Sequence, residues 1–217
     1  MNAPRVLVTG FEPFDGDGIN PSREIARALH GSEIAGHRVL GAVLPTEFAR
    51  APAALEALID RHEPTLVLAL GLAASRGGLG LERVTLNWID ARIPDNAGAQ
   101  PVDVPVHAGA PAAYFASLPL KAMLARLQAA GIAATLSHSA GTFVCNQVFF
   151  ALAHRIATRT PQLRGGFVHV PCIPAQAAQY AGAVPMELAT MIESVRLCVE
   201  TALTVPAELH FAAGAID

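Results

Sequence analysis

The sequence has few cysteines, little excess charge and no long apolar run. Its three cysteines, Cys145, Cys172 and Cys198, are an odd number without a CxxC pair, so we expect no disulfide framework. Fifteen Lys and Arg face 18 Asp and Glu, and the net charge of −3 gives no electrostatic surface for a nucleic-acid backbone. Glycine, proline or a charged residue breaks every apolar stretch at about strand length, so no membrane-spanning segment is expected.

The chain begins with residues 1–5 and passes directly into an apolar run, so we expect no signal peptide and a cytoplasmic location. A reducing cytoplasm would also preserve a reactive thiol. Hydrophobic residues make up 52% of the 217 residues, which favours a well-buried core and, beyond it, apolar surface hidden in an oligomer. No Ser- or Pro-rich linker divides the chain, so we expect residues 1–217 to form a single domain.

Strand-like apolar runs alternate with helical patterns along the chain. This alternation predicts a three-layer α/β/α sandwich around a mostly parallel, mixed and twisted sheet. Residues 90–118 show no clear periodicity, and an unstructured stretch of that length is typical of a lid or binding loop. The sequence predicts strands at 5–8, 39–44, 65–70, 83–88, 132–137 and 167–170, and helices at about 20–30, 48–59, 119–130, 144–158 and 188–199.

Cys145 stands where a strand ends, small residues turn and a helix opens. The helix start predicted at Val144 places the thiol in the first turn, where free amides and the helix dipole favour a thiolate. The same amides could hold an oxyanion. A buried structural cysteine fits this position equally well, because free cysteines are often interior. Cys198 lies in a helix and is best explained by core packing, while Cys172, after a strand, stays ambiguous.

A nucleophilic thiol needs a base, and His169 is the best candidate among eight histidines. It lies inside an apolar strand, where a core imidazole and a general base are equally good interpretations. Among the others, His107 lies in the long loop, His138 lies at the end of the strand before Cys145, and five fit solvated positions: His30, His37, His62, His154 and His210. A third group usually orients the base. The candidates from composition are the carboxylates Glu82, Asp90, Asp95 and Asp103, and nothing in the pattern separates them.

Phe11 and Phe14 lie three residues apart in the loop after the first strand. They could form an apolar slot for a flat ring, or simply cover the core. The loop matches neither GxGxxG nor GxxxxGK[ST], which argues against a nucleotide site. No HExxH motif or Cys/His cluster supports a metal site.

Taken together, the motifs strongly resemble pyroglutamyl peptidase I, a family of cysteine peptidases also called pyrrolidone-carboxylate peptidases. The likeness runs in order from about Val6 to Leu203. It is carried by the segments Thr9–Phe14, Glu82–Val84, Asp90–Asn96, Ala140–Asn146 and Gly165–Pro171.

The resemblance implies a cysteine exopeptidase that hydrolyses the amide bond after an N-terminal pyroglutamyl (5-oxoprolyl) residue of a peptide, through a thioester intermediate. Matched motif by motif, Cys145 takes the place of the nucleophile, His169 of the base and Glu82 of the orienting acid. Arg92 matches an arginine near the reacting carbonyl, where its backbone amide would help to hold the oxyanion.

The resemblance further implies that Phe11 and Phe14 flank the lactam ring. It also implies a cytosolic homo-oligomer, a tetramer, that uses no metal and no cofactor.

One position departs from the family pattern. Where the family often has Gln after the glycine that ends the third strand, this chain has Leu72, which cannot hydrogen-bond the lactam amide. Three alternatives stay open: an amidase acting on a different small acyl group, a binding protein without catalysis, and a nucleotide-binding α/β protein. The last is disfavoured by the missing phosphate motifs.

Overall fold

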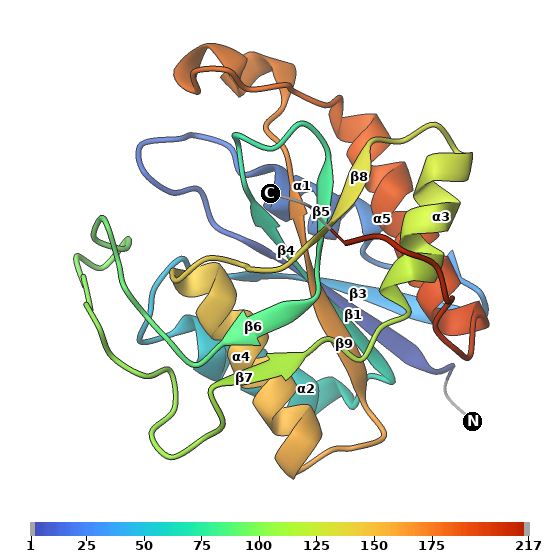
Figure 1. Cartoon of the computed structure of the whole chain (residues 1–217), viewed down its shortest axis with the longest axis horizontal. Coiled ribbons are helices and arrows are strands. Elements are labelled where there is room, and N and C mark those ends of the chain that lie inside the picture. The colour runs from blue at the N-terminus through green and yellow to red at the C-terminus, as the bar shows by residue number, and fades with distance from the viewer. Residues whose placement is uncertain (1–2, 215–217) are drawn as a thin grey trace.

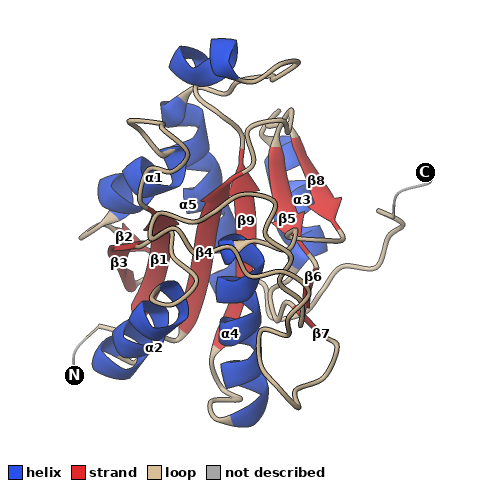
Figure 2. Cartoon of the chain, turned by 90° about the vertical axis from the view of Figure 1, so that its left-hand side faces the viewer, coloured by secondary structure: helices blue, strands red, loops and turns tan. Residues whose placement is uncertain are grey.

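One mixed sheet of seven strands, in the order β2-β3-β1-β4-β9-β5-β8, is covered by helices on both faces (Figures 1 and 2). This is a computed structural model, and it describes residues 3–214. Strands β3, β1, β4 and β9 run parallel, whereas β5 is antiparallel to β9 and β2 to β3. The predicted mostly parallel, mixed sheet in a three-layer sandwich is therefore confirmed.

Most predicted elements are present, with shifted ends. The strands are β1 (Arg5–Phe11), β2 (Glu33–Ile34), β3 (His37–Leu44), β4 (Leu66–Leu72), β5 (Leu79–Glu82), β6 (Val84–Leu86), β7 (Ala113–Phe115), β8 (Ala134–Ser137) and β9 (Arg164–Val170). The helices are α1 (Pro21–Leu29), α2 (Ala51–His62), α3 (Leu120–Ala129), α4 (Val144–Thr158), the 3₁₀ helix η1 (Pro174–Gln179) and α5 (Leu188–Thr204). The expectations for a signal peptide and for the domain limits rest partly on residues 1–2 and 215–217, which lie outside the described residues.

The central strands are buried on both faces, and alternate side chains enter two separate apolar layers. Val6 and Val8 of β1 belong to the layer that contains residues of α1, α3 and α5, while Leu7 belongs to the layer that contains residues of α2 and α4. Figure 2 shows α2 and α4 on one side of the sheet and α1 and α5 on the other. This explains why β4 is a continuous apolar run, since a strand covered on both faces has no polar side.

Helix α1 begins where the sequence predicts it. The Asn20 side chain accepts a hydrogen bond from the Ser22 backbone amide at 3.1 Å, and Pro21 occupies the first helical position. A side chain on Gly10 could not be accommodated, because its Cβ would lie 2.1 Å from the Ser22 carbonyl oxygen. The helix therefore packs directly on the end of β1, next to Phe11, whose backbone N–H donates to Ser22 Oγ at 3.0 Å.

The interpretation of residues 83–88 as one strand with an outward polar face is wrong. The chain forms β5 up to Glu82 and then β6, and Thr85, expected on a polar face, is fully buried. Strand β6 leaves the large sheet and pairs with β7, which lies inside the segment predicted to lack regular structure. Between β6 and β7, residues 87–112 form a long loop (green in Figure 1) that includes most of that segment.

Asn146 holds β6 against the start of α4. Its side-chain Oδ1 accepts from Thr85 Oγ1 and from the Leu86 backbone amide, both at 2.9 Å. Its Nδ2 donates to the carbonyl oxygens of Leu86 at 2.8 Å and of Trp88 at 3.1 Å. This fully buried amide thus replaces the strand partner that β6 lacks on that side.

Replacing Asn146 with Ala should lower the free energy of unfolding by roughly 2–4 kcal/mol, because several buried backbone groups lose their partner. Urea unfolding monitored by circular dichroism measures this. Gln162→Ala, at an exposed position, is the matched control and should change stability by less than about 0.5 kcal/mol. Equal stability of the two variants would contradict the role given to Asn146.

Candidate active site

A cleft of about 360 Å³ opens at the sheet edge where β1, β4 and β9 end. The strand order changes direction between β1 and β4, because β3 follows β1 to one side and β4 lies on the other. Ligands of open α/β sheets bind at such switch points, beyond the carboxyl ends of the strands. The cleft wall includes every candidate site residue except Glu82: Phe11, Phe14, Arg92, Cys145 and His169. It also includes Leu72, the position that departs from the family pattern.

Cys145 is the second residue of α4, as predicted, and its side chain is only partly exposed. The sulfur lies over β4, where a Cβ built on Gly71 would come within 2.7 Å of it. Gly71 therefore provides the space in which the thiol sits.

The expectation of a stabilised thiolate is wrong. Burial, and then the negative charge of Glu82, raise the pKa of Cys145 to about 12, against weaker lowering by a backbone hydrogen bond and by Arg76. The helix start does not outweigh the loss of solvent. At neutral pH the resting group is a thiol, so its attack on a carbonyl requires a base to accept the proton.

His169 and Glu82 meet across two antiparallel strands. His169 lies opposite Gly80 in the register of β9 and β5, so Glu82, two residues further along β5, is its diagonal neighbour on the same face. The Nδ1–H of His169 donates to Glu82 Oε1 at 2.7 Å. This bond leaves Nε2 as the free ring nitrogen, and His169 lines the same cleft as Cys145.

Glu82 itself is fully buried and does not line the cleft. Composition alone left four carboxylates open, and the structure places the other three away from the imidazole. Asp90 and Asp103 are exposed, while Asp95 accepts hydrogen bonds from the backbone amides of Phe48, Ala97 and Ala99 and so organises a turn.

Arg76 belongs to this cluster, and the sequence reasoning did not select it. Its Nη1 lies 2.9 Å from Glu82 Oε1, and its Nη2 donates to Ser137 Oγ at 3.1 Å. The available signal was a single arginine at the end of a loop of small residues, just before the strand that carries Glu82. This pattern does not indicate which residues Arg76 contacts, because its contact with β8 depends on the order of strands in the sheet.

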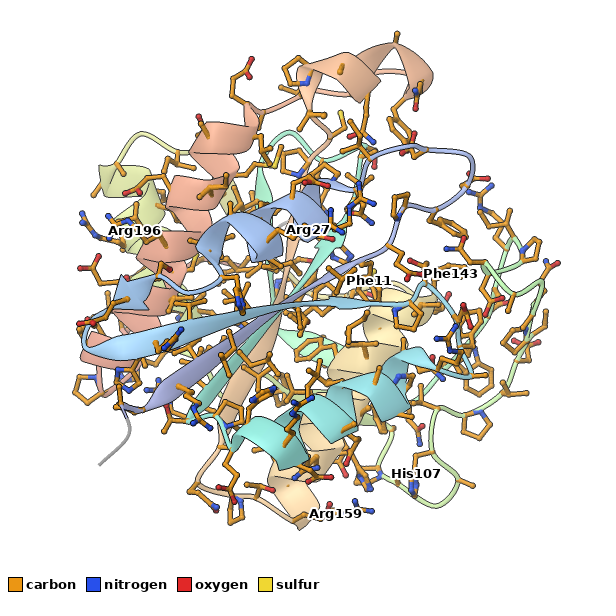
Figure 3. The ribbon with its side chains drawn as sticks, turned by 180° about the vertical axis from the view of Figure 1, so that it is seen from behind. Phe11, Arg27, His107, Phe143, Arg159 and Arg196 are labelled. Atoms are coloured by element: carbon orange, nitrogen blue, oxygen red, sulfur yellow. The ribbon has the colours of Figure 1, made fainter. Side chains whose placement is uncertain are left out.

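Aromatic rings form one wall of the cleft. Phe14 packs on Phe143 with ring centroids 5.2 Å apart, and Phe143 meets Phe48 edge-on at 4.9 Å. Figure 3 shows Phe11 and Phe143 close together near the start of α4. Phe143, which the sequence reasoning passed over, immediately precedes α4 and lines the cleft with Phe11 and Phe14.

Tyr180, which directly follows the unpredicted helix η1, also lines the cleft. Asp17, in the loop after β1, accepts hydrogen bonds from Tyr180 Oη at 2.6 Å and from Gln176 Nε2 at 2.8 Å. These bonds fix the loop that carries Phe14. Arg92 reaches the cleft from the long loop with an exposed side chain.

Within residues 3–214, no group of three or more His, Cys, Asp and Glu side chains is placed to hold a metal ion. Nor does this part of the chain contain a helix long and apolar enough to cross a membrane.

A thiol at a helix start, sharing a cleft with an imidazole that is bonded to a buried carboxylate, is the arrangement of a cysteine-dependent hydrolase. The comparisons narrow this class to one family. A family model described as pyroglutamyl peptidase matches residues 4–205. The chain therefore belongs to the pyroglutamyl peptidase family, as the resemblance predicted.

Similar proteins cover nearly the whole chain. A pyrrolidone-carboxylate peptidase of Gloeobacter violaceus is 49% identical over 90% of this chain and 95% of its own length. One of Erwinia tasmaniensis is 47% identical over 97% and 98%. The crystal structure of pyroglutamyl peptidase I from Bacillus amyloliquefaciens superposes with a TM-score of 0.94 at 36% identity, covering 97% of this chain and all of that one.

Replacing Glu82 with Gln should make Cys145 easier to alkylate. The Glu82 charge raises the pKa of the thiol, so its removal shifts the pH midpoint of alkylation to lower values. The measurement is iodoacetamide labelling across pH, with the Cys145 peptide quantified by mass spectrometry. The peptide containing Cys198, whose pKa is raised by burial alone, is the internal control and should not shift. A midpoint that rises or stays in place would refute this electrostatic account.

Proposed function

We propose that this chain is a cysteine exopeptidase that removes an N-terminal pyroglutamyl residue from peptides. Membership of the pyroglutamyl peptidase family gives the substrate class. The observation that carries the chemistry is the hydrogen bond between His169 and Glu82 in the wall of the cleft that also holds Cys145. We further infer that residues 1–217 act as one domain, since both apolar layers pack on the same sheet.

The high pKa of the thiol defines the first step. Because Cys145 is protonated at neutral pH, His169 Nε2 accepts its proton as the sulfur attacks the pyroglutamyl carbonyl. The imidazolium then gives this proton to the leaving amine, and a thioester remains on Cys145. His169 next takes a proton from water, whose oxygen attacks the thioester carbonyl. The C–S bond then breaks, pyroglutamate leaves, and the imidazolium returns the proton to the sulfur of Cys145. Glu82 holds the imidazole in one tautomer and stabilises its cation.

The oxyanion formed in both half-reactions needs hydrogen-bond donors. Backbone amides at the start of α4 are unpaired within the helix and lie beside the nucleophile. The backbone amide of Arg92 is the second donor that the family resemblance suggests. Each donor of this kind contributes roughly 3–4 kcal/mol to transition-state stabilisation.

Recognition of the lactam depends on shape and on backbone groups. The cleft is small, and aromatic side chains suit the faces of a neutral ring. Two polar side chains in the wall, Asn20 and Thr46, already donate to the carbonyl oxygen of Glu12. With Leu72 apolar, we propose that backbone N–H and C=O groups bind the lactam amide, and that the loop of residues 87–112 closes over it.

The protein is further proposed to be a cytoplasmic homotetramer that binds neither nucleic acid nor membrane, and to use no metal or cofactor. The support is the family resemblance, the balanced charge and the exposed apolar side chains on β7 and in the long loop. Phe115 is 74% exposed and Val102 is 55% exposed, which is unusual for side chains that face only water.

Replacing Cys145 with Ala should abolish hydrolysis of a pyroglutamyl-anilide while the fold is retained, because the attacking sulfur is gone. Cys198→Ala, which removes a thiol buried in α5, is the control and should keep most of the activity. Release of the anilide and circular dichroism measure the two effects. Residual turnover by the Cys145 variant near the wild-type rate would refute the proposal, as would a wild-type protein that hydrolyses a prolyl- or acetyl-anilide but not the pyroglutamyl one.

Replacing Phe14 with Ala should lower kcat/KM for the anilide by roughly tenfold, mostly through KM, because the lactam loses one apolar face. Steady-state kinetics measure this change. Phe115→Ala removes an equally large ring far more exposed to solvent and should leave kcat/KM nearly unchanged. If both variants behaved alike, Phe14 would not contact the ring.

A further inference from the structure

Arg76 touches two parts of the active site that are far apart in the sequence. Its Nη1 lies 2.9 Å from Glu82 Oε1, the same oxygen that accepts the hydrogen bond from His169. Its Nη2 donates to Ser137 Oγ at 3.1 Å and to the Ser139 carbonyl oxygen at 3.3 Å. Ser137 ends β8, and Ser139 lies in the turn that leads from this strand to Cys145.

The Glu82 carboxylate needs a positive partner because it has no contact with solvent. Its side chain is 0% exposed, and among the described residues its Oε2 has no hydrogen-bond partner. A neutral imidazole supplies a donor but no charge. A buried, uncompensated carboxylate is strongly destabilised, so the guanidinium is the group that balances it in the resting state.

The backbone leaves room for this ion pair. A Cβ built on Gly80 would lie 1.8 Å from Arg76 Nη1 and 2.9 Å from Arg76 Cζ. The guanidinium therefore lies against β5 at Gly80, the one residue of that strand that has no side chain. Gly80 is also the residue opposite His169 in the sheet, so the arginine packs on β5 at the position that pairs with the histidine.

Few charged groups surround this cluster. Strand β9 contributes His169, α4 contributes the Cys145 thiol, and the loop after β4 contributes Arg76. Strand β8, which pairs with β5 on its other side, has the sequence Ala-Thr-Leu-Ser and contributes no charge. Glu82 and Arg76 are the charges that act on the thiol: Glu82 raises the pKa of Cys145 and Arg76 lowers it.

We propose that Arg76 is a positioning residue of the active site, which balances the charge of Glu82 and ties that carboxylate to the turn before the nucleophile. This inference rests on the proposed function, since it assigns Arg76 to the support of the His169–Glu82 pair. Arg76 does not line the cleft, so it acts on the reaction through its contact with Glu82 and through the effect of its charge on Cys145.

Without Arg76, an added proton is bound more readily by the buried cluster, because the nearby positive charge is gone. Loss of the active protonation state on acidification should then begin at higher pH. The thiol likewise gives up its proton less readily, because Arg76 lowers the pKa of Cys145. A residue that only stabilises the fold would move neither pH dependence.

The test compares Arg76→Gln, Arg76→Lys and wild type with a pyroglutamyl-anilide across pH. Arg76→Gln should lower kcat/KM between about twofold and a hundredfold, the range of coupling within one network, and shift the acid limb of the profile to higher pH. Arg76→Lys keeps the charge and should return the acid limb toward wild type. Arg196→Gln removes an arginine paired with Glu193 on α5, away from Phe11 and Phe143 in Figure 3, and should change neither quantity.

Two further variants separate a role through Glu82 from a general loss of stability. In a Glu82→Gln background, Arg76→Gln should cost much less activity than it does in wild type. Gly80→Ala keeps the arginine but displaces its guanidinium, so it should shift the acid limb in the same direction as Arg76→Gln. An unchanged acid limb in Arg76→Gln, or an equal loss in both backgrounds, would overturn the proposal.

Alkylation of Cys145 tests the inference without any substrate. Iodoacetamide labelling of Arg76→Gln should have its midpoint at higher pH than in wild type. If the wild-type protein did not cleave pyroglutamyl-anilide, the proposed function would fail while this shift could still be found. If the protein were active but the shift and the acid-limb change were both absent, only the role of Arg76 would fail.

Discussion

A carboxylate with no exposure to solvent lies at the centre of this structure, and the elements around it are arranged to satisfy it. Glu82 ends the short strand β5, which runs antiparallel to its neighbour β9 in a sheet that is otherwise mostly parallel. That direction makes His169 a diagonal neighbour on the same face, so the base meets the acid at 2.7 Å. Arg76, from the loop that leads into β5, supplies the opposite charge at 2.9 Å. Without these two partners, burial of the charge would cost several kcal/mol.

The same exclusion of water shapes the nucleophile. Burial raises the pKa of Cys145 to about 12, so the helix start does not produce a resting thiolate. A thiol that stays protonated is a weak nucleophile alone, but the low polarity around it also strengthens every hydrogen bond to a charge that forms during the reaction. In the proposed function, the imidazole in the cleft wall, oriented by Glu82, accepts the proton of this thiol. Thiol, base and acid therefore depend on one another, and no single residue type explains the site.

Much of the fold was predictable because its signals are local. The Asn20–Pro21 start of α1, the apolar run of β4 and the limits of α4 depend on capping, burial on both faces and helical spacing, which neighbouring residues encode. The prediction for residues 83–88 failed because the structure there depends on a residue distant in the sequence. Thr85 was assigned to an outer face by alternation, yet it is buried, because its hydroxyl bonds to Asn146, which lies sixty-one residues away in the sequence. No local pattern reports such a partner.

By itself, the sequence determined which chemistry the chain could carry: a cysteine at a helix opening, a histidine in an apolar strand and a set of ordered motifs that resemble one family. Only the tertiary structure decided how these groups act on one another. The sheet order brought β5 between β9 and β8, which selected Glu82 among four carboxylates and added Arg76 to the cluster. The tertiary structure also makes Cys145 a protonated thiol, where the sequence predicted a thiolate. A pKa depends on which charges and how much solvent surround a group, and residues distant in the chain set both.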